Sequence, residues 1–293
     1  KAMTIEEKLE FIHGTGMLLS NTYGPVAGSI GDVVPGAAGT TLAIPRLGIP
    51  AIVMADGPAG LRIDTLRTGD SRRYYTTAFP TGTIVASTWN PQLARKMGEA
   101  MGEEVKDYGV DILLAPGVNI QRNPLCGRNY EYFSEDPLLS GIMGAAIVQG
   151  IQNNGVGASL KHFAVNNQET SRSSVDAVIS QRALREIYLR GFEIAVKKAL
   201  PWTVMSAYNK INGTYCSENP WLLTDVLRSQ WGFKGMVTTD WFAGRNYANQ
   251  LKAGNDLLMP GRKAETKRIK AALESGQITE ADIDKNVGRI LQL

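Results

Sequence analysis

Short apolar runs alternate along the chain with longer segments whose apolar residues recur at helical spacing. The longer segments predict helices at residues 91–106, 138–153, 181–198 and 222–230. The short runs predict strands at residues 51–55, 82–87, 111–115, 157–160, 203–207, 236–239 and 256–259, and residues 14–19 are a candidate for an eighth strand. Because strands and helices alternate, we expect parallel strands joined by crossover helices. The sequence therefore predicts an α/β fold, namely a (β/α)8 TIM-like barrel.

The chain shows no internal break that would divide it. No low-complexity linker or repeat interrupts it, so we interpret residues 1–293 as a single barrel domain. Residues 23–41, rich in Gly, Pro and Ala, predict a surface or rim loop. After a turn at Ser275 and Gly276, Thr279 is expected to cap a last helix that runs to the end of the chain. No Gly-x-Gly-x-x-Gly follows an early strand, which argues against an open dinucleotide-binding sheet.

Composition and charge mainly exclude classes of function. The 31 Lys and Arg nearly balance the 28 Asp and Glu, and no dense basic run with interleaved aromatics indicates nucleic-acid binding. No run approaches the ~18 consecutive apolar residues of a membrane span. Cys126 and Cys216 do not have metal-ligand spacing, and the only histidines are His13 and His162, so we expect no metal and no cofactor. Because the chain begins at Lys1 without an initiator Met, we expect a periplasmic or secreted location, with the cytoplasm as the alternative.

Polar side chains follow nearly every predicted strand at the point where it ends. They include Asp56 and Arg62 after residues 51–55, Arg128 beyond residues 111–115, Lys161 and His162 after residues 157–160, Tyr208 after residues 203–207, and Asp240 with Trp241 after residues 236–239. Singly, each has a structural explanation, such as a helix cap for Asp240, and Met205 within its strand is typical of packing. In a barrel, however, these ends converge on one mouth. Their joint recurrence favours a binding site.

The residue types suit a polyhydroxylated ligand. Asp56 can accept two hydroxyl protons, and Trp241 offers an apolar face to the C–H surface of a sugar ring. Charge-assisted hydrogen bonds would come from Arg62, Arg128 and Lys161. We also expect these cations to keep the pKa of Asp240 low and its carboxylate ionised, as a nucleophile requires. A phosphorylated sugar is less favoured, because no Gly-rich loop opens a helix after the last strands.

Several segments of the chain match one family in order. They are Asp56-Gly57-Pro58-Ala59-Gly60-Leu61-Arg62, the stretch from Asn123 to Pro137, the stretch from Lys161 to Glu169, Met205-Ser206-Ala207-Tyr208-Asn209, and Thr239-Asp240-Trp241. These segments resemble the family 3 glycoside hydrolases, the β-glucosidase group. The likeness runs from about Met3 to Leu291.

The resemblance implies a retaining, exo-acting β-glucosidase that hydrolyses the non-reducing-end β-D-glucosyl bond of oligosaccharides or glucosides without a metal. By this analogy Asp240 attacks the anomeric carbon and forms a covalent glycosyl-enzyme. The residues implied to line the sugar subsite are Asp56, Arg62, Arg128, Lys161, His162, Met205, Tyr208 and Trp241. A β-xylosidase or β-N-acetylglucosaminidase would need only small changes in the pocket.

One part of the implied mechanism has no obvious source. In similar members the acid/base is a Glu of a C-terminal α/β sandwich domain, which we expect as the partner of this barrel. Another branch carries a His/Asp dyad after the Lys-His-Phe strand, but residues 166–172 contain no histidine, which excludes that version. Substitutes within the chain would be Glu131, Glu135, Glu169 or Glu218. We favour the second domain, with Glu131 bracing Arg128, and Glu169 and Arg172 bracing their loop.

Two other functions remain open from the residues. Lys161 at a strand end could be the Schiff-base lysine of an aldolase-type barrel. Its neighbour His162 and the surrounding charges argue against this, because a Schiff-base lysine needs a desolvating pocket. Taken alone, the 293 residues could also be a sugar-binding module with little turnover.

Overall fold

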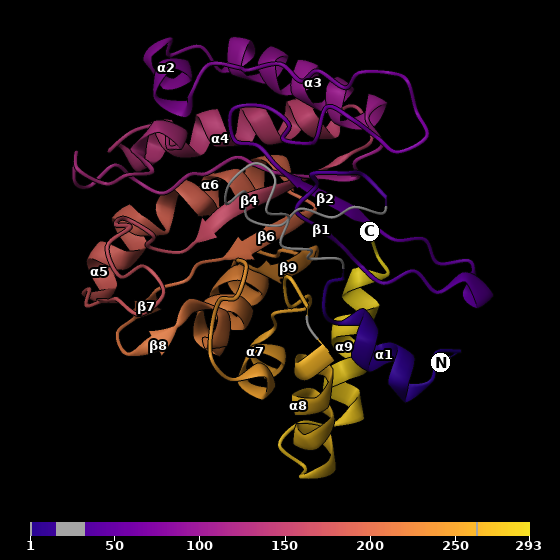
Figure 1. The fold of residues 1–293 in the computed structure, drawn as a ribbon. Coiled ribbons are helices and arrows are strands. Elements are labelled where there is room, and N and C mark those ends of the chain that lie inside the picture. Colours follow the sequence, from indigo (N-terminus) through magenta and orange to yellow (C-terminus); the bar gives the residue numbers. More distant parts are fainter. Residues whose placement is uncertain (1, 16–32, 262) are drawn as a thin grey trace.

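The computed structural model describes residues 2–15, 33–261 and 263–293 as an α/β fold built on a mixed six-stranded sheet (Figure 1). The strands, in sheet order, are β1 (Gly39–Thr40), β2 (Val53–Asp56), β3 (Ile112–Leu114), β4 (Gly157–Phe163), β6 (Thr203–Ser206) and β9 (Met236–Thr239). From β2 to β9 all neighbours are parallel, and β1 alone pairs antiparallel with β2. The five parallel strands therefore present their carboxyl ends on one side.

Helices cover the sheet, and their starts agree with local sequence signals. The helices are α1 (Ile5–Phe11), α2 (Gly82–Ser87), α3 (Pro91–Asp107), α4 (Pro137–Gln152), α5 (Gln181–Ala183), the π-helix η3 (Leu184–Tyr188), α6 (Arg190–Ala199), the π-helix η5 (Trp221–Gln230), α7 (Tyr247–Ala253), α8 (Lys263–Glu274) and α9 (Glu280–Ile290). Asn90 and Asp136 cap α3 and α4, each of which has Pro at its first position. No helix within residues 2–15, 33–261 and 263–293 is long and apolar enough to cross a membrane.

Short elements complete the connections. Three 3-10 turns lie at η1 (Pro45–Leu47), η2 (Asn129–Glu131) and η4 (Cys216–Glu218). A small second sheet has the order β5 (Asp176–Ala177), β7 (Lys210–Ile211) and β8 (Thr214–Tyr215). Its register joins the loop after β4 to the loop after β6, because Asp176 pairs with Lys210. This places the two loops side by side above the carboxyl ends of the strands.

The parallel strands bury both faces, as strands covered on two sides do. In β3, Leu113 packs into the cluster formed with α3, α4 and α6, whereas Ile112 and Leu114 belong to a second cluster that includes residues of α1, α8 and α9. The same alternation separates Val204 from Met205 in β6. The period of two therefore directs one face of β3 and β6 toward the cluster with α3, α4 and α6, and the other face toward the second cluster.

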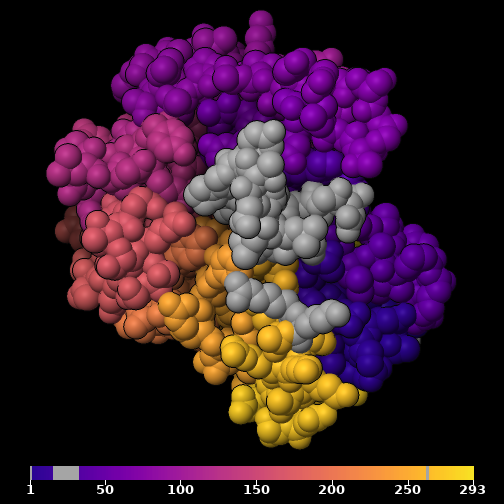
Figure 2. Space-filling view, in the orientation of Figure 1, coloured from indigo at the N-terminus to yellow at the C-terminus, as the bar shows by residue number. Residues whose placement is uncertain are grey.

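Single bridges extend the sheet beyond β9. They join Thr238 to Leu257, Leu258 to His13, and Thr15 to Thr40 of β1. Near them, α1 packs against α8 and α9, and Lys8 forms an ion pair with Asp284 at 2.6 Å. The indigo and yellow ends of the described chain consequently lie side by side (Figures 1 and 2).

Five of the predicted strands are confirmed with small shifts in their bounds, but two predictions are wrong in part or in full. Residues 82–87 form the helix α2: Val85 and Ala86 are buried while Ile84 is 58% exposed, and so short an apolar run does not distinguish a strand from a helix. Residues 256–259 form only single bridges. Of residues 14–19 only the first two are described, and Thr15 forms a bridge.

The predicted helices are present, with irregularities that periodicity did not reveal. Residues 181–198 divide into α5, η3 and α6, and residues 222–230 form a π-helix. The break after α8 and the restart at α9 are confirmed, since Thr279 and Asp282 form a capping box. In the predicted rim loop, residues 33–41 include β1, and residues 23–32 lie outside the described part.

Candidate active site

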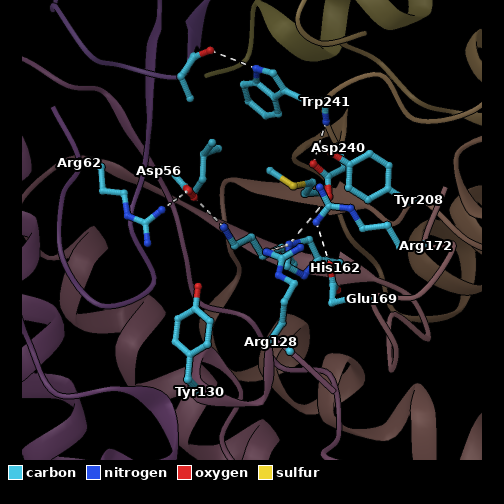
Figure 3. Close-up of a pocket in the computed structure, with 15 residues that line it drawn as sticks. Asp56, Arg62, Arg128, Tyr130, His162, Glu169, Arg172, Tyr208, Asp240 and Trp241 are labelled. Carbon is cyan, nitrogen blue, oxygen red and sulfur yellow. Dashed lines mark hydrogen bonds and ion pairs between the residues drawn. The ribbon is translucent and has the colours of Figure 1, made fainter. Parts of the chain in front are cut away.

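A pocket of about 360 Å³ opens at the carboxyl ends of the parallel strands (Figure 3). All nine residues that the sequence predicted for the site line this pocket: Asp56, Arg62, Arg128, Lys161, His162, Met205, Tyr208, Asp240 and Trp241. Its wall is completed by Ala38, Leu114, Gly127, Tyr130, Glu169 and Arg172. The topology brings these side chains together, because the carboxyl ends of parallel strands meet at one edge of a sheet.

Asp56 ends β2, and a tight turn brings Arg62 back beside it. Gly57 has φ of 154°, and a Cβ there would lie 1.9 Å from the carbonyl oxygen of Gly60, so the turn requires glycine. Nη1 of Arg62 lies 3.4 Å from Oδ2 of Asp56. Nζ of Lys161, which is 3% exposed, donates to Oδ1 at 2.9 Å.

This arrangement determines the charge of Asp56. Burial alone would raise its pKa, but Lys161, through its charge and its hydrogen bond, outweighs burial, and Arg62 and Arg128 add to the effect. The pKa of Asp56 consequently lies below its ordinary value. At neutral pH the carboxylate is ionised and can only accept hydrogen bonds.

Arg128 reaches the floor of the pocket from the segment that precedes η2. Its Nε donates to Oε1 of Glu131, which is 3% exposed, so the predicted brace between these two residues is present. Its Nη2 lies 2.7 Å from Nε2 of His162. Burial would lower the pKa of Arg128, but Glu131, Tyr132 and Asp240 raise it above its ordinary value. The guanidinium therefore stays charged.

The contact with Arg128 also fixes the state of His162. A guanidinium can only donate, so Nε2 of His162 is the acceptor and the ring proton is on Nδ1, 3.2 Å from the hydroxyl of Tyr132. Burial, together with the charges of Arg128, Lys161 and Arg172, holds the pKa of His162 well below its ordinary value. The ring is neutral, and its 3.9 Å approach to Asp240 is not an ion pair.

Asp240 follows β9 and lies almost entirely inside the protein, with 7% exposure. Its Oδ1 accepts the backbone N–H of Trp241 at 2.7 Å. Its Oδ2 is buried and has no hydrogen-bond partner of good geometry among the described residues. Indole Nε1 of Trp241 donates to the carbonyl of Ala38 at 3.0 Å, which holds the ring against the pocket. One carboxylate oxygen is thus anchored while the other is unpaired.

The expectation of a low pKa for Asp240 is wrong. Burial raises its pKa above the ordinary value, and the charges of Arg128 and Lys161, the N–H of Trp241 and the neighbouring hydroxyl of Tyr208 offset burial only in part. The sequence shows how many cations lie near Asp240 in the motifs, but it does not show how deeply the carboxyl group is buried.

Two side chains of the loop after β4 form the wall opposite Asp56. Oε2 of Glu169 accepts from Nη1 of Arg172 at 2.9 Å, and the guanidinium of Arg172 lies over the ring of Tyr208, 4.7 Å from its centroid. Burial and the charge of Asp240 raise the pKa of Tyr208 above its ordinary value, so its hydroxyl keeps its proton. The prediction that Glu169 and Arg172 brace their loop is confirmed, but both also face the pocket.

Some wall residues were missed by sequence reasoning. Tyr130 lies two positions after Arg128 in the Gly-Arg-Asn-Tyr segment, which was a usable signal, and its side chain extends to the pocket beside Arg62 and Arg128 (Figure 3). The sequence contained no comparable signal for Ala38 and Leu114, because small and apolar residues are common throughout the core and only the fold shows which of them line a pocket. Met205, predicted for the site, is buried in β6 at the base of the pocket.

The other carboxylates proposed as acid/base substitutes differ in position. Glu131 is engaged by Arg128, and Glu218 accepts the backbone N–H groups of Arg245 and Asn246. Neither these two nor Glu135 lines the pocket, so Asp56, Glu169 and Asp240 are its carboxylates as far as the described chain shows. Within the same residues no group of three or more His, Cys, Asp or Glu side chains is placed to hold a metal ion.

Comparison with known proteins agrees with this geometry. Residues 38–293 match the family model described as "Glycosyl hydrolase family 3 N terminal domain". The chain is 49% identical over 257 residues to thermostable β-glucosidase B of Acetivibrio thermocellus, and the aligned region covers 86% of this chain and 34% of the relative. It is also 49% identical over 250 residues to an exo-α-(1→6)-L-arabinopyranosidase of Bifidobacterium longum, covering 84% and 33%.

The structure of β-glucosidase 3B from Thermotoga neapolitana in complex with α-D-glucose superposes with a TM-score of 0.93 at 56% identity, covering 99% of this chain and 41% of that one. The chain thus spans about a third of the length of the curated relatives it matches. The match of the family model over most of the chain shows that this protein belongs to family 3 of the glycoside hydrolases.

Proposed function

We propose that this domain is the catalytic barrel of a retaining, exo-acting β-glucosidase and that Asp240 is its nucleophile. The unpaired oxygen of Asp240 carries the proposal. Oδ1 of Asp240 is fixed by a backbone N–H, whereas Oδ2 is buried beside the polar pocket and has no partner among the described residues. A carboxylate held in this way is prepared to react with a ligand. A structural carboxylate at this depth would have both oxygens satisfied.

The rest of the pocket supports a sugar as the ligand. Asp56 accepts, while Arg62, Arg128 and Lys161 donate, so vicinal hydroxyls can be bound at one end. Trp241 supplies an apolar face near the reacting carbon. The volume of about 360 Å³ is near the lower end of the ~300–1,000 Å³ of ligand sites, which suits one terminal sugar unit and therefore exo action.

In the first step, Oδ2 of Asp240 would attack the anomeric carbon. A C–O bond to Asp240 forms while the glycosidic C–O bond breaks, and the departing oxygen takes a proton from a general acid. In the second step, water attacks the same carbon, gives a proton to the same acid/base group and releases Asp240. Arg128 and Lys161 lie close enough to affect the charge of Asp240, so they would stabilise the carboxylate as it leaves.

We infer that the acid/base comes from outside these 293 residues. A general acid must hold a proton near neutral pH, but Asp56 has a lowered pKa and Glu169 is ion-paired with Arg172. A carboxyl group from a C-terminal α/β sandwich domain could be placed about 5–5.5 Å from Asp240, as retention requires. The greater length of the relatives is consistent with such a domain.

We also propose that the sheet closes into a (β/α)8-like barrel. Single bridges support closure, because they join Thr238 to Leu257, Leu258 to His13, and Thr15 to Thr40 of β1. The second hydrophobic cluster, to which alternate residues of the strands contribute, supports it as well. The antiparallel β1 would be a departure from the all-parallel pattern.

Glucose is the sugar we propose, although the relatives include proteins named for glucose and for L-arabinopyranose at the same identity. The test is to assay the complete gene product with aryl β-D-glucopyranosides, β-D-xylopyranosides and α-L-arabinopyranosides, and to follow the first-formed anomer by NMR. We expect the highest kcat/KM with the glucoside and initial release of β-glucose. Inversion, or no hydrolysis of any glycoside despite glucose binding by calorimetry, would refute the proposal, and the second result would indicate a sugar-binding module.

A further inference from the structure

The ion pair between Glu169 and Arg172 has no role in the mechanism proposed above. Both residues line the pocket, and Nη1 of Arg172 donates to Oε2 of Glu169 at 2.9 Å. The side chains of Glu169 and Arg172 are 25% and 43% exposed, so the pair lies at the open wall of the pocket. An ion pair that only stabilised the loop would not need to face the ligand.

Arg172 connects this pair to the reacting group. Its guanidinium covers the ring of Tyr208 at 4.7 Å from the centroid, a distance typical of a cation–π contact. Tyr208 and Asp240 lie next to each other in the wall of the pocket (Figure 3), and the hydroxyl of Tyr208 lowers the pKa of that carboxyl. Figure 3 shows Arg172 lying between Tyr208 and Glu169. The position of the Tyr208 hydroxyl therefore depends on where Arg172 is held.

Glu169 is held in turn from the protein interior. Its Oε1 accepts from Nδ2 of Asn166 at 3.3 Å, and the same amide donates to the hydroxyl of Tyr132 at 3.0 Å. Tyr132 is fully buried and contacts His162. Glu169 thus uses one oxygen to attach to the buried frame and the other to fix Arg172.

We propose that Glu169 is a positioning residue for the attack by Asp240. It holds Arg172 across Tyr208, so that the hydroxyl of Tyr208 stays beside the carboxylate that forms the glycosyl-enzyme. The inference rests on the proposed function of Asp240. It predicts that Glu169 matters for the rate of attack and acts through Tyr208, with no direct contact to the sugar and no transfer of a proton.

The chain offers a closely matched control. Glu193 of α6 forms an ion pair with Arg190 at the same i,i+3 spacing and the same 2.9 Å, with 23% exposure of the Glu side chain. It also pairs with Lys197 at 2.7 Å, and it does not line the pocket. Glu193→Gln should therefore leave the reaction unchanged, while Glu169→Gln removes the same charge beside the pocket.

The test is a double-mutant cycle in the complete gene product. The measured quantity is the rate at which an activated 2-deoxy-2-fluoro-β-glucoside labels Asp240, together with the affinity for glucose and the melting temperature. We expect Glu169→Gln to slow labelling about tenfold with glucose affinity unchanged within about twofold, and to slow it by less than about twofold when Tyr208→Phe is already present. Arg172→Met should give the same loss, with no further loss in combination with Glu169→Gln.

Three results would overturn the inference. One is an equal slowing in both Tyr208 backgrounds, or no slowing at all, since Glu169 would then act independently of Tyr208. Another is a loss that grows with the basicity of the leaving group and is restored by azide, because that identifies Glu169 as the acid/base. The third applies if Glu169→Gln does not fold: an Arg172→Met variant that labels at the wild-type rate then refutes the inference. If the wild-type protein itself gives no label on Asp240, the proposed function has failed instead.

Discussion

Nζ of Lys161 lies 2.9 Å from Oδ1 of Asp56, so a buried cation of β4 neutralises a carboxylate of β2 across the intervening strand β3. The pair affects two groups in the pocket. Lys161 keeps the pKa of Asp56 below its ordinary value, and its charge also offsets part of the burial that raises the pKa of Asp240. One lysine therefore connects the hydroxyl-binding end of the pocket with its reactive end.

Asp56→Asn should weaken sugar binding. The amide has one acceptor oxygen and no charge, so it loses charge-assisted hydrogen bonds worth about 1.5–3 kcal/mol. We expect the dissociation constant for glucose, measured by calorimetry, to rise about 10- to 150-fold. Asp64→Asn, in the same loop but outside the pocket, should stay within about twofold of wild type. Equal affinities for Asp56→Asn and wild type would show that Asp56 does not bind the sugar.

His162 predicts a specific pH dependence of stability. Its folded pKa is well below the unfolded value of 6.5, so above pH 6.5 the ring is neutral in both states. As the pH falls below 6.5, the unfolded chain takes up a proton that the folded protein does not, and the free energy of unfolding falls by up to ~1.4 kcal/mol per pH unit until the folded pKa is reached.

The measurement is urea unfolding of wild type and His162→Gln at pH 7.5, 6.5 and 5.5. The difference between their free energies of unfolding should be constant above pH 6.5. Between pH 6.5 and 5.5 the free energy of unfolding of the wild type should then fall by about 1 kcal/mol relative to that of the variant. Parallel pH profiles for the two proteins would mean that His162 is not held neutral by the fold.

Asp256 is expected to be a major determinant of stability. Its side chain is fully buried and accepts from Arg228, from Arg289 at 2.9 Å and from the backbone of Val237 at 2.8 Å. Asp256→Asn leaves two partly buried guanidinium groups without their carboxylate, which should cost about 3–5 kcal/mol in urea unfolding.

A control for the Asp256 substitution is available on the surface. Arg182 and Glu186 form an ion pair in which both side chains are mostly exposed, so Glu186→Gln should change the free energy of unfolding by no more than about 0.5 kcal/mol. If Asp256→Asn were as mild as this substitution, the buried cluster would not stabilise the fold.

The architecture was predictable where local pattern and tertiary environment agree. The apolar runs of β3, β6 and β9 are buried on both faces, so they read as strands without ambiguity. Residues 82–87 are also a short run with apolar residues, but one face is solvent-exposed, and a six-residue window does not show which side of a run will be covered. Of the single bridges at residues 256–259, the one at Leu258 likewise depends on His13, which is distant in the sequence.

For the site, residue identity was more predictable than electrostatic state. Strand-end position and motif order located Asp240 and its neighbours. The pKa of Asp240 depends on the depth of the carboxyl group and on distances to Arg128 and Lys161, which sequence does not encode locally. The neutral tautomer of His162 depends in the same way on one contact with Arg128.

The central claim is that Asp240 forms the covalent intermediate. The direct measurement is mass spectrometry of peptides from the complete gene product after incubation with an activated 2-deoxy-2-fluoro-β-glucoside, which slows breakdown of the glycosyl-enzyme. We predict one added fluoroglucosyl group on the peptide that contains Asp240, loss of activity in step with labelling, and no label in Asp240→Asn. Label on a peptide containing Asp56 or Glu169 instead, or hydrolysis that persists at the wild-type rate in Asp240→Asn, would contradict the account.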